Sequence, residues 1–586
     1  MRRIAIGFVV LSATSAVTTG LPASAAGPWP APVTSPIEAR QDTMRLFATG
    51  TDRYDPGLIF GSATTGTTTV LADAGRTGSL AGKAVVDVST NNSGVCALDS
   101  VGGLHCWGDA KGFNRFGAGD NVDAPAPVTI TITVDGQARS VTNVAVSDEE
   151  TCVTAWLKAV CWGSAAYMHP VATTPTVVPG APDSVAIDAD AGKACAIATD
   201  STLWCWGTRA TELGVGKTDG KVDPTKLAGS LAGRQVTTIS VGEDVSCASD
   251  TLGQLHCWGV GSSGVGTGQS GDVLEPVRVR GSLANERVIG VSVGATVYAI
   301  DARGRLHQWS GTATPTLANK LGALAGKRVL QVSADSRGDA SHVCAVVLGG
   351  DVYCRGFNAY GRLGIGGSPE MYGTTDNFTK MLPGAARGMQ AVEAEVGAEY
   401  TFVVSAKPLF APLPKVSSGA LVMRLDTLAK ALGTGSVGAQ KPASTKGTAV
   451  TMPIEGSSDS RVSLGGTLTL TTTDGTERVL SGGTVDLKSG AVSFIVQGVG
   501  WPYDGNRITL FTADVEGKVS TKTKGKVTTT TLRSSPTVMA DVKDFPGETF
   551  FPGETFFPGE TFFPGDMLDP GAPVGSFSGT WKAQRR

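Results

Sequence analysis

The 586-residue sequence contains little charge, because only 17% of its residues are Asp, Glu, Lys or Arg and the formal net charge is -3. It lacks the basic excess that binds nucleic acid or an anionic membrane surface. Beyond the N-terminus, no stretch approaches the roughly 18 apolar residues that a membrane span needs. We therefore expect no nucleic-acid partner and no membrane insertion, whereas the 78 glycines favour a turn-rich β protein.

Motifs for chemistry are also scarce. Three of the five histidines, His105, His256 and His307, recur at one position of a repeat, which predicts a structural role. No G-x-S-x-G nucleophile elbow occurs. Asp188 and Asp190 resemble the start of a calcium loop that lacks its acidic twelfth position. We expect no catalytic residue, metal ligand or cofactor, although structural calcium and a Ser-His-Asp group that converges only in the fold remain open.

The N-terminus carries the signs of export. Arg2 and Arg3 precede an apolar run, and the small residues at 23–26 provide a cleavage site. This pattern predicts a signal peptide at residues 1–26, followed by a Pro-rich linker at 27–42. The expected location is extracellular, with association to the cell surface as an open alternative.

The ten cysteines fall into five pairs, four separated by ten residues and one by nine. Alternating apolar residues around a polar tip predict a β-hairpin between the members of each pair. Gly102, Gly253 and Gly350 stand six residues after the first cysteine, where the loop needs a left-handed residue. In an exported chain the facing cysteines can form disulfides, and their spacing is too long for a zinc knuckle. The expected pairs are Cys96 and Cys106, Cys152 and Cys161, Cys195 and Cys205, Cys247 and Cys257, and Cys344 and Cys354.

The hairpin belongs to a longer repeat. Two further copies keep the frame without cysteines, with Tyr298 and Gln308 at the two cysteine positions of one copy and Phe402 at the first position of the other. Near the N-terminus, Ala48-Thr49-Gly50 stands where other copies have Cys-Trp-Gly. Six whole copies and two halves make seven if the ends meet. Such a multi-strand repeat predicts propeller blades, and closure of the ring removes the open sheet edges.

The elements Cys-Ala-Leu, a glycine turn, Cys-Trp-Gly and a loop such as FNAYGRLGIG at 357–366 resemble the repeat of the regulator of chromosome condensation. The resemblance covers residues 43–406 and implies a seven-bladed propeller that serves as a rigid binding scaffold. The nuclear roles of that family do not carry over, because an exported chain meets neither a nuclear GTPase nor chromatin. Some secreted bacterial proteins of this class inhibit β-lactamases by binding them with one face of the propeller. The resemblance therefore implies that such a propeller can act by binding alone, without catalysing a reaction.

Aromatic residues outside the repeat register are the candidates for partner binding. Trp156 lies at a predicted hairpin tip, Tyr167 and Met168 lie in the loop that follows that hairpin, and Phe113 and Phe116 lie in the loop of the preceding blade. Exposed aromatic residues on neighbouring blades can form a hot spot for a protein partner. The alternative is that they fill local hydrophobic gaps.

The pattern changes after residue 407, where PLFAPLPK marks a boundary. We predict a linker at 407–445 that contains a short amphipathic helix, because four leucines fall on one helical face. These leucines are Leu421, Leu425, Leu428 and Leu432.

Residues 446–543 alternate apolar and polar residues around Asp-Gly turns at 474–475 and 504–505, which predicts an antiparallel β domain. In pattern it resembles secreted β domains of actinobacterial haem-acquisition proteins, which implies haem binding as an alternative, although Tyr503 is its only tyrosine. Residues 544–586 form a tail with FPGETF repeats, which either dock on a partner, close the β domain or reflect an expanded DNA repeat.

We therefore predict an all-β protein, a seven-bladed β-propeller closed by N- and C-terminal strands and followed by a smaller antiparallel β domain. The expected function is an extracellular binding scaffold, a monomer that binds an extracellular protein as an enzyme inhibitor or adhesive surface protein. The alternatives are a secreted propeller-type lyase or hydrolase, or a haem- or glycan-binding protein. Acidic and histidine side chains at the central channel favour the enzyme, and an aromatic patch on blades one and two favours binding.

Overall fold

The computed structural model describes residues 43–51, 67–407, 416–539 and 573–584, apart from gaps inside the second and third ranges. The chain divides into two compact units, and the boundary between them falls after residue 409 in the sequence. The predicted signal peptide at 1–26 and linker at 27–42 lie outside the described residues. Within the described ranges, no helix has the length and apolar character needed to cross a membrane.

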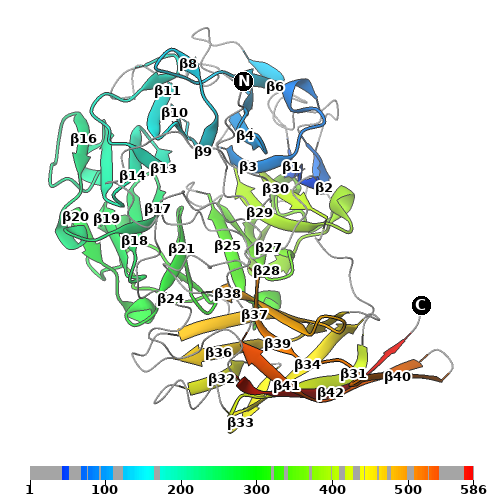
Figure 1. The fold of residues 1–586 in the computed structure, drawn as a ribbon. Coiled ribbons are helices and arrows are strands. Elements are labelled where there is room, and N and C mark those ends of the chain that lie inside the picture. Colours follow the sequence, from blue (N-terminus) through cyan, green and yellow to red (C-terminus); the bar gives the residue numbers. More distant parts are fainter. Residues whose placement is uncertain are drawn as a thin grey trace. The chain divides into compact units, whose positions relative to one another are not determined.

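The first unit consists of seven four-stranded antiparallel sheets around a common centre (Figure 1). Six of them follow the chain from the innermost to the outermost strand. They are β3 (Val85–Thr90), β4 (Gly94–Asp99), β5 (Leu104–Gly108) and β6 (Ala124–Ile130) in blade one; β9 (Val141–Val146), β10 (Glu150–Ala155), β11 (Lys158–Gly163) and β12 (Thr176–Val177) in blade two; β13 (Ser184–Asp190), β14 (Lys193–Ala198), β15 (Leu203–Gly207) and β16 (Val222–Lys226) in blade three; β17 (Val236–Val241), β18 (Val245–Asp250), β19 (Leu255–Gly259) and β20 (Val273–Arg278) in blade four; β21 (Val288–Val293), β22 (Val297–Asp301), β23 (Leu306–Trp309) and β24 (Thr316–Leu317) in blade five; and β25 (Val329–Ala334), β26 (His342–Val347), β27 (Val352–Phe357) and β28 (Thr374–Lys380) in blade six.

Blade seven closes the ring with strands from both ends of the propeller. Its order is β2 (Thr68–Asp73), β1 (Arg45–Gly50), β30 (Tyr400–Ala406) and β29 (Gln390–Val396). Ala48 faces Phe402 across β1 and β30, which are the two positions that cysteines hold in other blades. The predicted seven-bladed propeller and its closure are confirmed.

Glycines occupy the left-handed position of the hairpin loops, as predicted. Gly102, Gly253 and Gly350 have φ values of 81°, 72° and 77°, and Gly304 of blade five has 73°. An L side chain rarely adopts this left-handed conformation, so the turn favours glycine at these positions.

Polar side chains join the innermost strands of neighbouring blades. The side chain opposite the first cysteine position accepts a hydrogen bond from a backbone N–H group of the next blade. These pairs are Ser89 with Val146, Asp188 with Val241, Ser240 with Val293, Ser292 with Ala334, and Ser333 with Val396, at 2.7 to 3.0 Å. Asp188 therefore links blades three and four.

The second unit is a 12-stranded antiparallel sheet around its own core (Figure 1). Its strands are β31 (Val416–Arg424), β32 (Ser436–Gln440), β33 (Ser444–Lys446), β34 (Ala449–Ser457), β35 (Arg461–Leu464), β36 (Thr467–Thr471), β37 (Glu477–Asp486), β38 (Ala491–Gln497), β39 (Arg507–Ala513), β40 (Val519–Lys524), β41 (Val527–Met539) and β42 (Pro573–Gln584). The pairs β36–β37 and β38–β39 flank the two predicted Asp-Gly turns, so the predicted antiparallel β domain is confirmed.

This sheet extends beyond the predicted limits at both ends. The predicted helix is wrong at Leu421, which lies on β31 and is buried together with Met423 and Leu425. That spacing of two residues is the period of a strand, and it prevails because β31 pairs with both β34 and β42. Leu428 and Leu432 lie outside the described residues.

The last strand, β42, lies in the predicted tail. It pairs with β31 and β41 and buries Phe577 and Trp581, and the Trp581 indole N–H donates to Ser457 Oγ at 2.8 Å. The end of the tail therefore completes the sheet, while the FPGETF repeats themselves lie outside the described residues.

Candidate binding sites on the propeller

All ten cysteines form disulfides within their own blades, in the five predicted pairs. The paired residues face each other across the two central strands, with Cα–Cα distances of 4.1 to 4.2 Å. Among the described residues, no group of three or more His, Cys, Asp or Glu side chains could hold a metal ion.

A tryptophan from the next blade packs against each disulfide in the regular interfaces. Trp258 of blade four is fully buried in one hydrophobic cluster with the Cys195–Cys205 disulfide of blade three. The glycine loop of blade three covers the indole so closely that a Cβ at Gly214 would lie 2.6 Å from Trp258 Cδ1. The indole therefore packs with both the disulfide and the glycine loop of blade three at this interface.

The repeated histidines belong to buried networks that tie the linkers between blades to the hairpins. In blade one, Ser79 Oγ lies 2.7 Å from His105 Nδ1, and His105 Nε2 lies 3.0 Å from Asp99 Oδ2. Burial lowers the pKa of His105. Burial alone would raise the pKa of Asp99, but hydrogen bonds from Lys83 and His105 lower the pKa of Asp99 to about 2. The same Ser-His-Asp contacts recur at Ser230, His256 and Asp250, and at Ser282, His307 and Asp301.

A Ser-His-Asp group therefore does converge in the fold, but three times and in equivalent positions. Its imidazole rings are buried on the strands β5, β19 and β23. Each network satisfies polar groups at the same structural joint, which confirms the predicted structural role of the three histidines.

The hairpin tip of blade two departs from the repeat. Trp156 and Leu157 form a two-residue tip between β10 and β11, with φ values of 51° and 64°. Two left-handed residues in succession define a type I′ turn, for which Asn-Gly is strongly preferred. Two bulky residues there store strain on the order of 1–2 kcal/mol each, and such strain collects at functional sites.

The Trp156 side chain is displayed at the surface with 45% of its area exposed. The Arg139 guanidinium stacks on its ring, with Cζ 4.0 Å from the ring centroid. Arg139 follows a small hairpin of β7 (Thr133–Val134) and β8 (Gln137–Ala138), where four other blade connections have a Gly-Ser-Leu or Gly-Ala-Leu turn. At the tip of blade one, Val101 is 73% exposed, and the adjacent Gly102 accepts a hydrogen bond from the Val141 N–H group of blade two.

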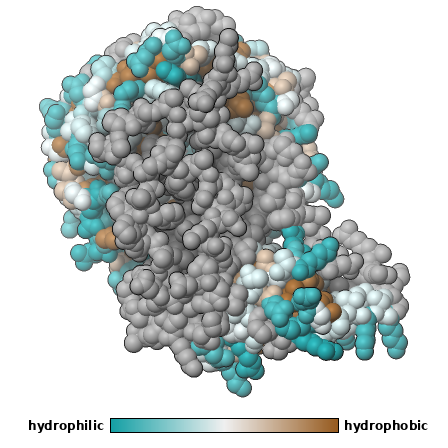
Figure 2. Space-filling model, viewed as in Figure 1, coloured by the Kyte–Doolittle hydropathy of each residue, from teal (hydrophilic) through white to brown (hydrophobic). Residues whose placement is uncertain are grey.

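Exposed large hydrophobic side chains are few among the described residues. Besides Val101 and Trp156 they are Val128, Leu252 and Leu382. On the face drawn in Figure 2, the coloured surface is mostly hydrophilic or neutral, and its hydrophobic areas are small and separate. Trp156 is therefore an unusual surface residue in this chain.

The other predicted partner-binding residues, Phe113, Phe116, Tyr167 and Met168, lie outside the described residues. Their segments follow β5 and β11 at the ends opposite the hairpin tips. The tip carrying Trp156 and the loop segments carrying the other four therefore begin at opposite ends of the blades, and joint binding by all five stays a prediction.

The interface between blades five and six lacks the disulfide, the tryptophan and the covering glycine loop of the regular interfaces. Tyr298 and Gln308 replace the disulfide of blade five and face each other across β22 and β23. Arg355 of blade six replaces the tryptophan, and its Nη2 donates to Tyr298 Oη at 2.8 Å and to Gln308 Oε1. The Arg355 Cζ atom also lies 4.8 Å from the Phe378 ring centroid.

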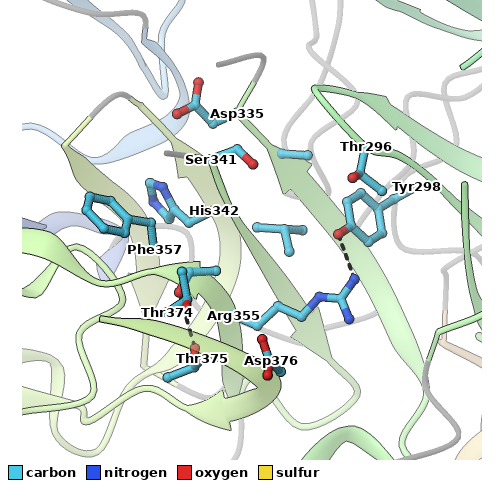
Figure 3. Close-up of a pocket in the computed structure, with 13 residues that line it drawn as sticks. Thr296, Tyr298, Asp335, Ser341, His342, Arg355, Phe357, Thr374, Thr375 and Asp376 are labelled. Atoms are coloured by element: carbon cyan, nitrogen blue, oxygen red, sulfur yellow. Dashed lines mark hydrogen bonds between the residues drawn. The ribbon is translucent and has the colours of Figure 1, made fainter. Parts of the chain in front are cut away.

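A pocket of about 350 Å³ opens at this interface (Figure 3). Blade five crosses from β23 to β24 within residues 310–315, whereas blade three uses residues 208–221 for the equivalent glycine loop. Without an indole and without a covering loop, the space between the blades stays open. Its polar lining residues are Thr296, Tyr298, Asp335, Ser341, His342, Arg355, Thr374, Thr375 and Asp376. The Tyr298 and Gln308 replacements were identified from the sequence, but this pocket was missed. A further sequence feature that indicates the pocket is Cys-Arg-Gly in blade six, where other blades have Cys-Trp-Gly.

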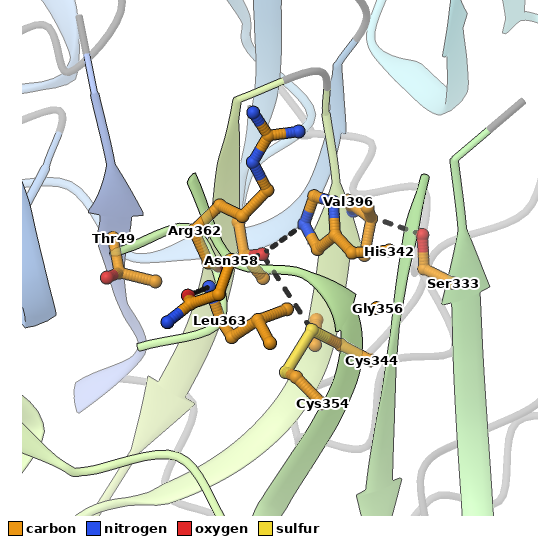
Figure 4. The surroundings of a disulfide bond; sticks show 12 residues. Thr49, Ser333, His342, Cys344, Cys354, Gly356, Asn358, Arg362, Leu363 and Val396 are labelled. Atoms are coloured by element: carbon orange, nitrogen blue, oxygen red, sulfur yellow. Dashed lines mark hydrogen bonds between the residues drawn. A yellow bond between two sulfur atoms is a disulfide. The ribbon is translucent and has the colours of Figure 1, made fainter. Parts of the chain in front are cut away.

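The interface between blades six and seven has also lost its tryptophan, but it keeps a glycine loop, of which Figure 4 shows Asn358, Arg362 and Leu363. Thr49 stands in the tryptophan position and donates to Gly361 O at 2.9 Å. The glycine loop of blade six covers it, since a Cβ at Gly364 would lie 3.1 Å from Thr49 Cγ2. Beside the Cys344–Cys354 disulfide, Thr401 Oγ1 lies 2.9 Å from His342 Nε2.

Carboxyl groups gather where blade seven meets blade one at the centre of the ring. Burial raises the pKa of Glu395 to about 8 and that of Asp87 to about 6, and burial with repulsion from Asp87 raises that of Glu393 well above its usual value. These acidic groups lie on the innermost strands β3 and β29, and Asp188 on the innermost strand β13 is close enough to raise the pKa of Glu395 further, whereas the described histidines lie on β5, β19, β23 and β26.

The chain resembles several known propellers, although no protein-family model matches it. The ultraviolet-B receptor UVR8 of Arabidopsis thaliana is 28% identical over 194 residues, which is 31% of this chain and 43% of UVR8. Human WBSCR16 matches in structure with a TM-score of 0.53 and 15% identity, over 63% of this chain and all of that chain. Yeast RCC1 (Prp20), solved with Kap60, gives a TM-score of 0.53 and 16% identity, over 69% of this chain and 97% of its own.

The chain therefore consists of a β-propeller with disulfides inside its blades, followed by a curled antiparallel sheet. The propeller is of the seven-bladed kind found in the regulator of chromosome condensation. The chain spans less than half the length of its curated relative UVR8, so this likeness concerns the propeller alone.

Proposed function

We propose that this protein is an exported binding scaffold that holds another extracellular protein against the hairpin tips of blades one and two. The observation that carries this proposal is Trp156, a large aromatic residue exposed in a strained turn. Tryptophan is enriched among the residues that dominate protein–protein binding energy, and strained, rigid display reduces the ordering cost of binding.

Neighbouring features support a partner with a concave or apolar surface that bears carboxylate groups. Arg139 adds a cation beside the Trp156 ring, and Val101 adds an exposed apolar group one blade away. Yeast Prp20p binds Gsp1p and histones, which is a precedent for protein recognition by this fold but gives no partner for this chain.

The export part of the proposal rests on the N-terminal pattern and on complete cysteine pairing. Disulfides persist mainly in oxidising compartments, and all ten cysteines are paired. In such a setting the scaffold acts as an inhibitor of a secreted enzyme or as an adhesive surface protein.

The test is quantitative capture from culture supernatant with three forms of the mature chain. They are the wild type, a W156N/L157G variant that installs the preferred Asn-Gly turn, and a control L252S variant that changes an equivalent exposed tip in blade four. We expect one protein to be retained by the wild type and by L252S and lost from W156N/L157G. Equal capture by all three forms, or no capture by the wild type, contradicts the proposal.

A further inference from the structure

We propose that the pocket between blades five and six binds an acidic sugar, a pyranose or short saccharide that carries a carboxylate. This site is separate from the tip surface, because its lining residues lie where β22, β26 and β28 begin and where β25 and β27 end. Those positions are at the opposite ends of the blades from the hairpin tips.

Arg355 is the anion-binding group of the pocket. Its Nη2 atom makes both of its hydrogen bonds, to Tyr298 and Gln308, so Nε and Nη1 remain available for a ligand. Among the described residues, Arg355 forms no ion pair with a carboxylate. Two contacts fix its plane, and with both Nη2 protons engaged, Nη1 donates one charge-assisted hydrogen bond to a carboxylate while the guanidinium supplies the neutralising charge.

The remaining walls fit a polyhydroxylated ring. Thr296, Ser341, Thr374 and Thr375 present hydroxyl groups, and Asp335 and Asp376 present carboxylates at opposite ends of the view in Figure 3. Hydroxyl groups both donate and accept, and carboxylates accept from sugar hydroxyls.

Aromatic rings complete this environment. Phe357 and Tyr298 lie on opposite sides of the pocket (Figure 3), and the partly exposed Phe357 ring offers an apolar surface to the C–H groups of a sugar ring. The volume of about 350 Å³ lies at the lower end of the range for small-molecule sites.

The charges of the lining narrow the ligand class further. Arg355 supplies one positive charge, which a single carboxylate neutralises, whereas doubly charged phosphate and sulfate carry more negative charge than one guanidinium neutralises. A purely cationic ligand is disfavoured by Arg355. One carboxylate among neutral hydroxyl groups satisfies both constraints, and it places the anion at Arg355 and the hydroxyls at the aspartates and threonines.

The experiment is a titration of the full mature chain, by calorimetry and by saturation-transfer NMR, with four probes. These are D-glucuronate, D-glucose, acetate and glycylglycine. We expect glucuronate to bind at least ~10-fold more tightly than the others, because it alone offers both a carboxylate and ring hydroxyls. Equal or tighter binding of glucose, acetate or glycylglycine, or no binding of glucuronate, overturns the proposal.

Three variants locate the binding. R355W restores the regular tryptophan and fills the pocket, and R355M removes the charge with less change in volume; both should lose at least ~10-fold in glucuronate affinity. The control R303A removes an exposed arginine at the tip of the same blade and should bind like the wild type. Unchanged affinity in a folded R355M protein, verified by circular dichroism, also overturns the proposal.

Discussion

The interface between blades three and four and that between blades five and six are built from the same repeat but have opposite outcomes. The first contains a disulfide, the buried Trp258 indole and a close-fitting glycine loop. The second contains Tyr298, Gln308 and Arg355 and lacks the loop, and it holds a pocket. The interface that keeps the disulfide, the indole and the glycine loop is packed. The interface that lacks all three contains a pocket lined by polar groups that can bind a ligand.

The largest expected effect comes from removing the residue that differs between these interfaces. Trp258→Ala leaves a large cavity in a packed cluster and should lower the free energy of unfolding by about 3–5 kcal/mol. Arg355→Ala removes a half-buried side chain beside an existing pocket and should cost less than about 1 kcal/mol. Urea unfolding of both variants checks the comparison, and equal losses would show that the two interfaces are energetically alike.

A second prediction restores the lost components. A Y298C/Q308C/R355W variant should form a sixth disulfide, because the two replaced residues face each other in the same register as the natural pairs. A loop of this length should stabilise the oxidised protein by about 2–3 kcal/mol. Unfolding with and without reductant isolates the contribution of the new bond, and a variant that forms the bond yet keeps full glucuronate binding would contradict the role of the missing indole.

The tip of blade two provides a third test, in which stability and function should change in opposite directions. W156N/L157G relieves two left-handed bulky residues and should raise the free energy of unfolding by about 1–2 kcal/mol. The same variant should lose the captured partner. A variant that is less stable than the wild type would show that Trp156 serves packing rather than binding.

The sequence was sufficient for the features that repeat. Seven blades, ring closure through Ala48 and Phe402, all five disulfides and the left-handed glycines follow from spacings that recur along the chain. Repetition works as evidence because each copy tests the pattern found in the others.

Features that occur once were harder to predict. Leu421 fits both a helical face and a strand, and only pairing with β34 and β42 decides for the strand. The strand β42 was not predicted, because it follows a low-complexity repeat and its apolar residues Phe577 and Trp581 were assigned to the same tail. The pocket depends on three losses in two blades, namely the disulfide and the glycine loop of blade five and the tryptophan of blade six. Only the fold shows that these three positions lie at one interface.

The smallest expected effect concerns the seam where blade seven meets blade one. Because burial raises the pKa of Glu395 from 4.5 to about 8, the folded state retains a proton that the unfolded chain releases. This stability is fully present below pH 4.5 and is lost as the pH rises through about 8. The Glu395→Gln variant cannot release this proton, so its free energy of unfolding should fall less as the pH rises. The difference should be on the order of 1 kcal/mol after screening by solvent and salt. Parallel pH profiles of the wild type and the variant would contradict the assignment to Glu395.

The most direct measurement of the central claim, that binding resides where the repeat is broken, is site-specific photo-crosslinking. A photoreactive benzoylphenylalanine replaces Trp156 in one protein and Leu252, at the regular tip of blade four, in another. After irradiation in culture supernatant, the account predicts one discrete crosslinked protein from position 156 and none from position 252. The same product from both positions, or a product from position 252 alone, would contradict it.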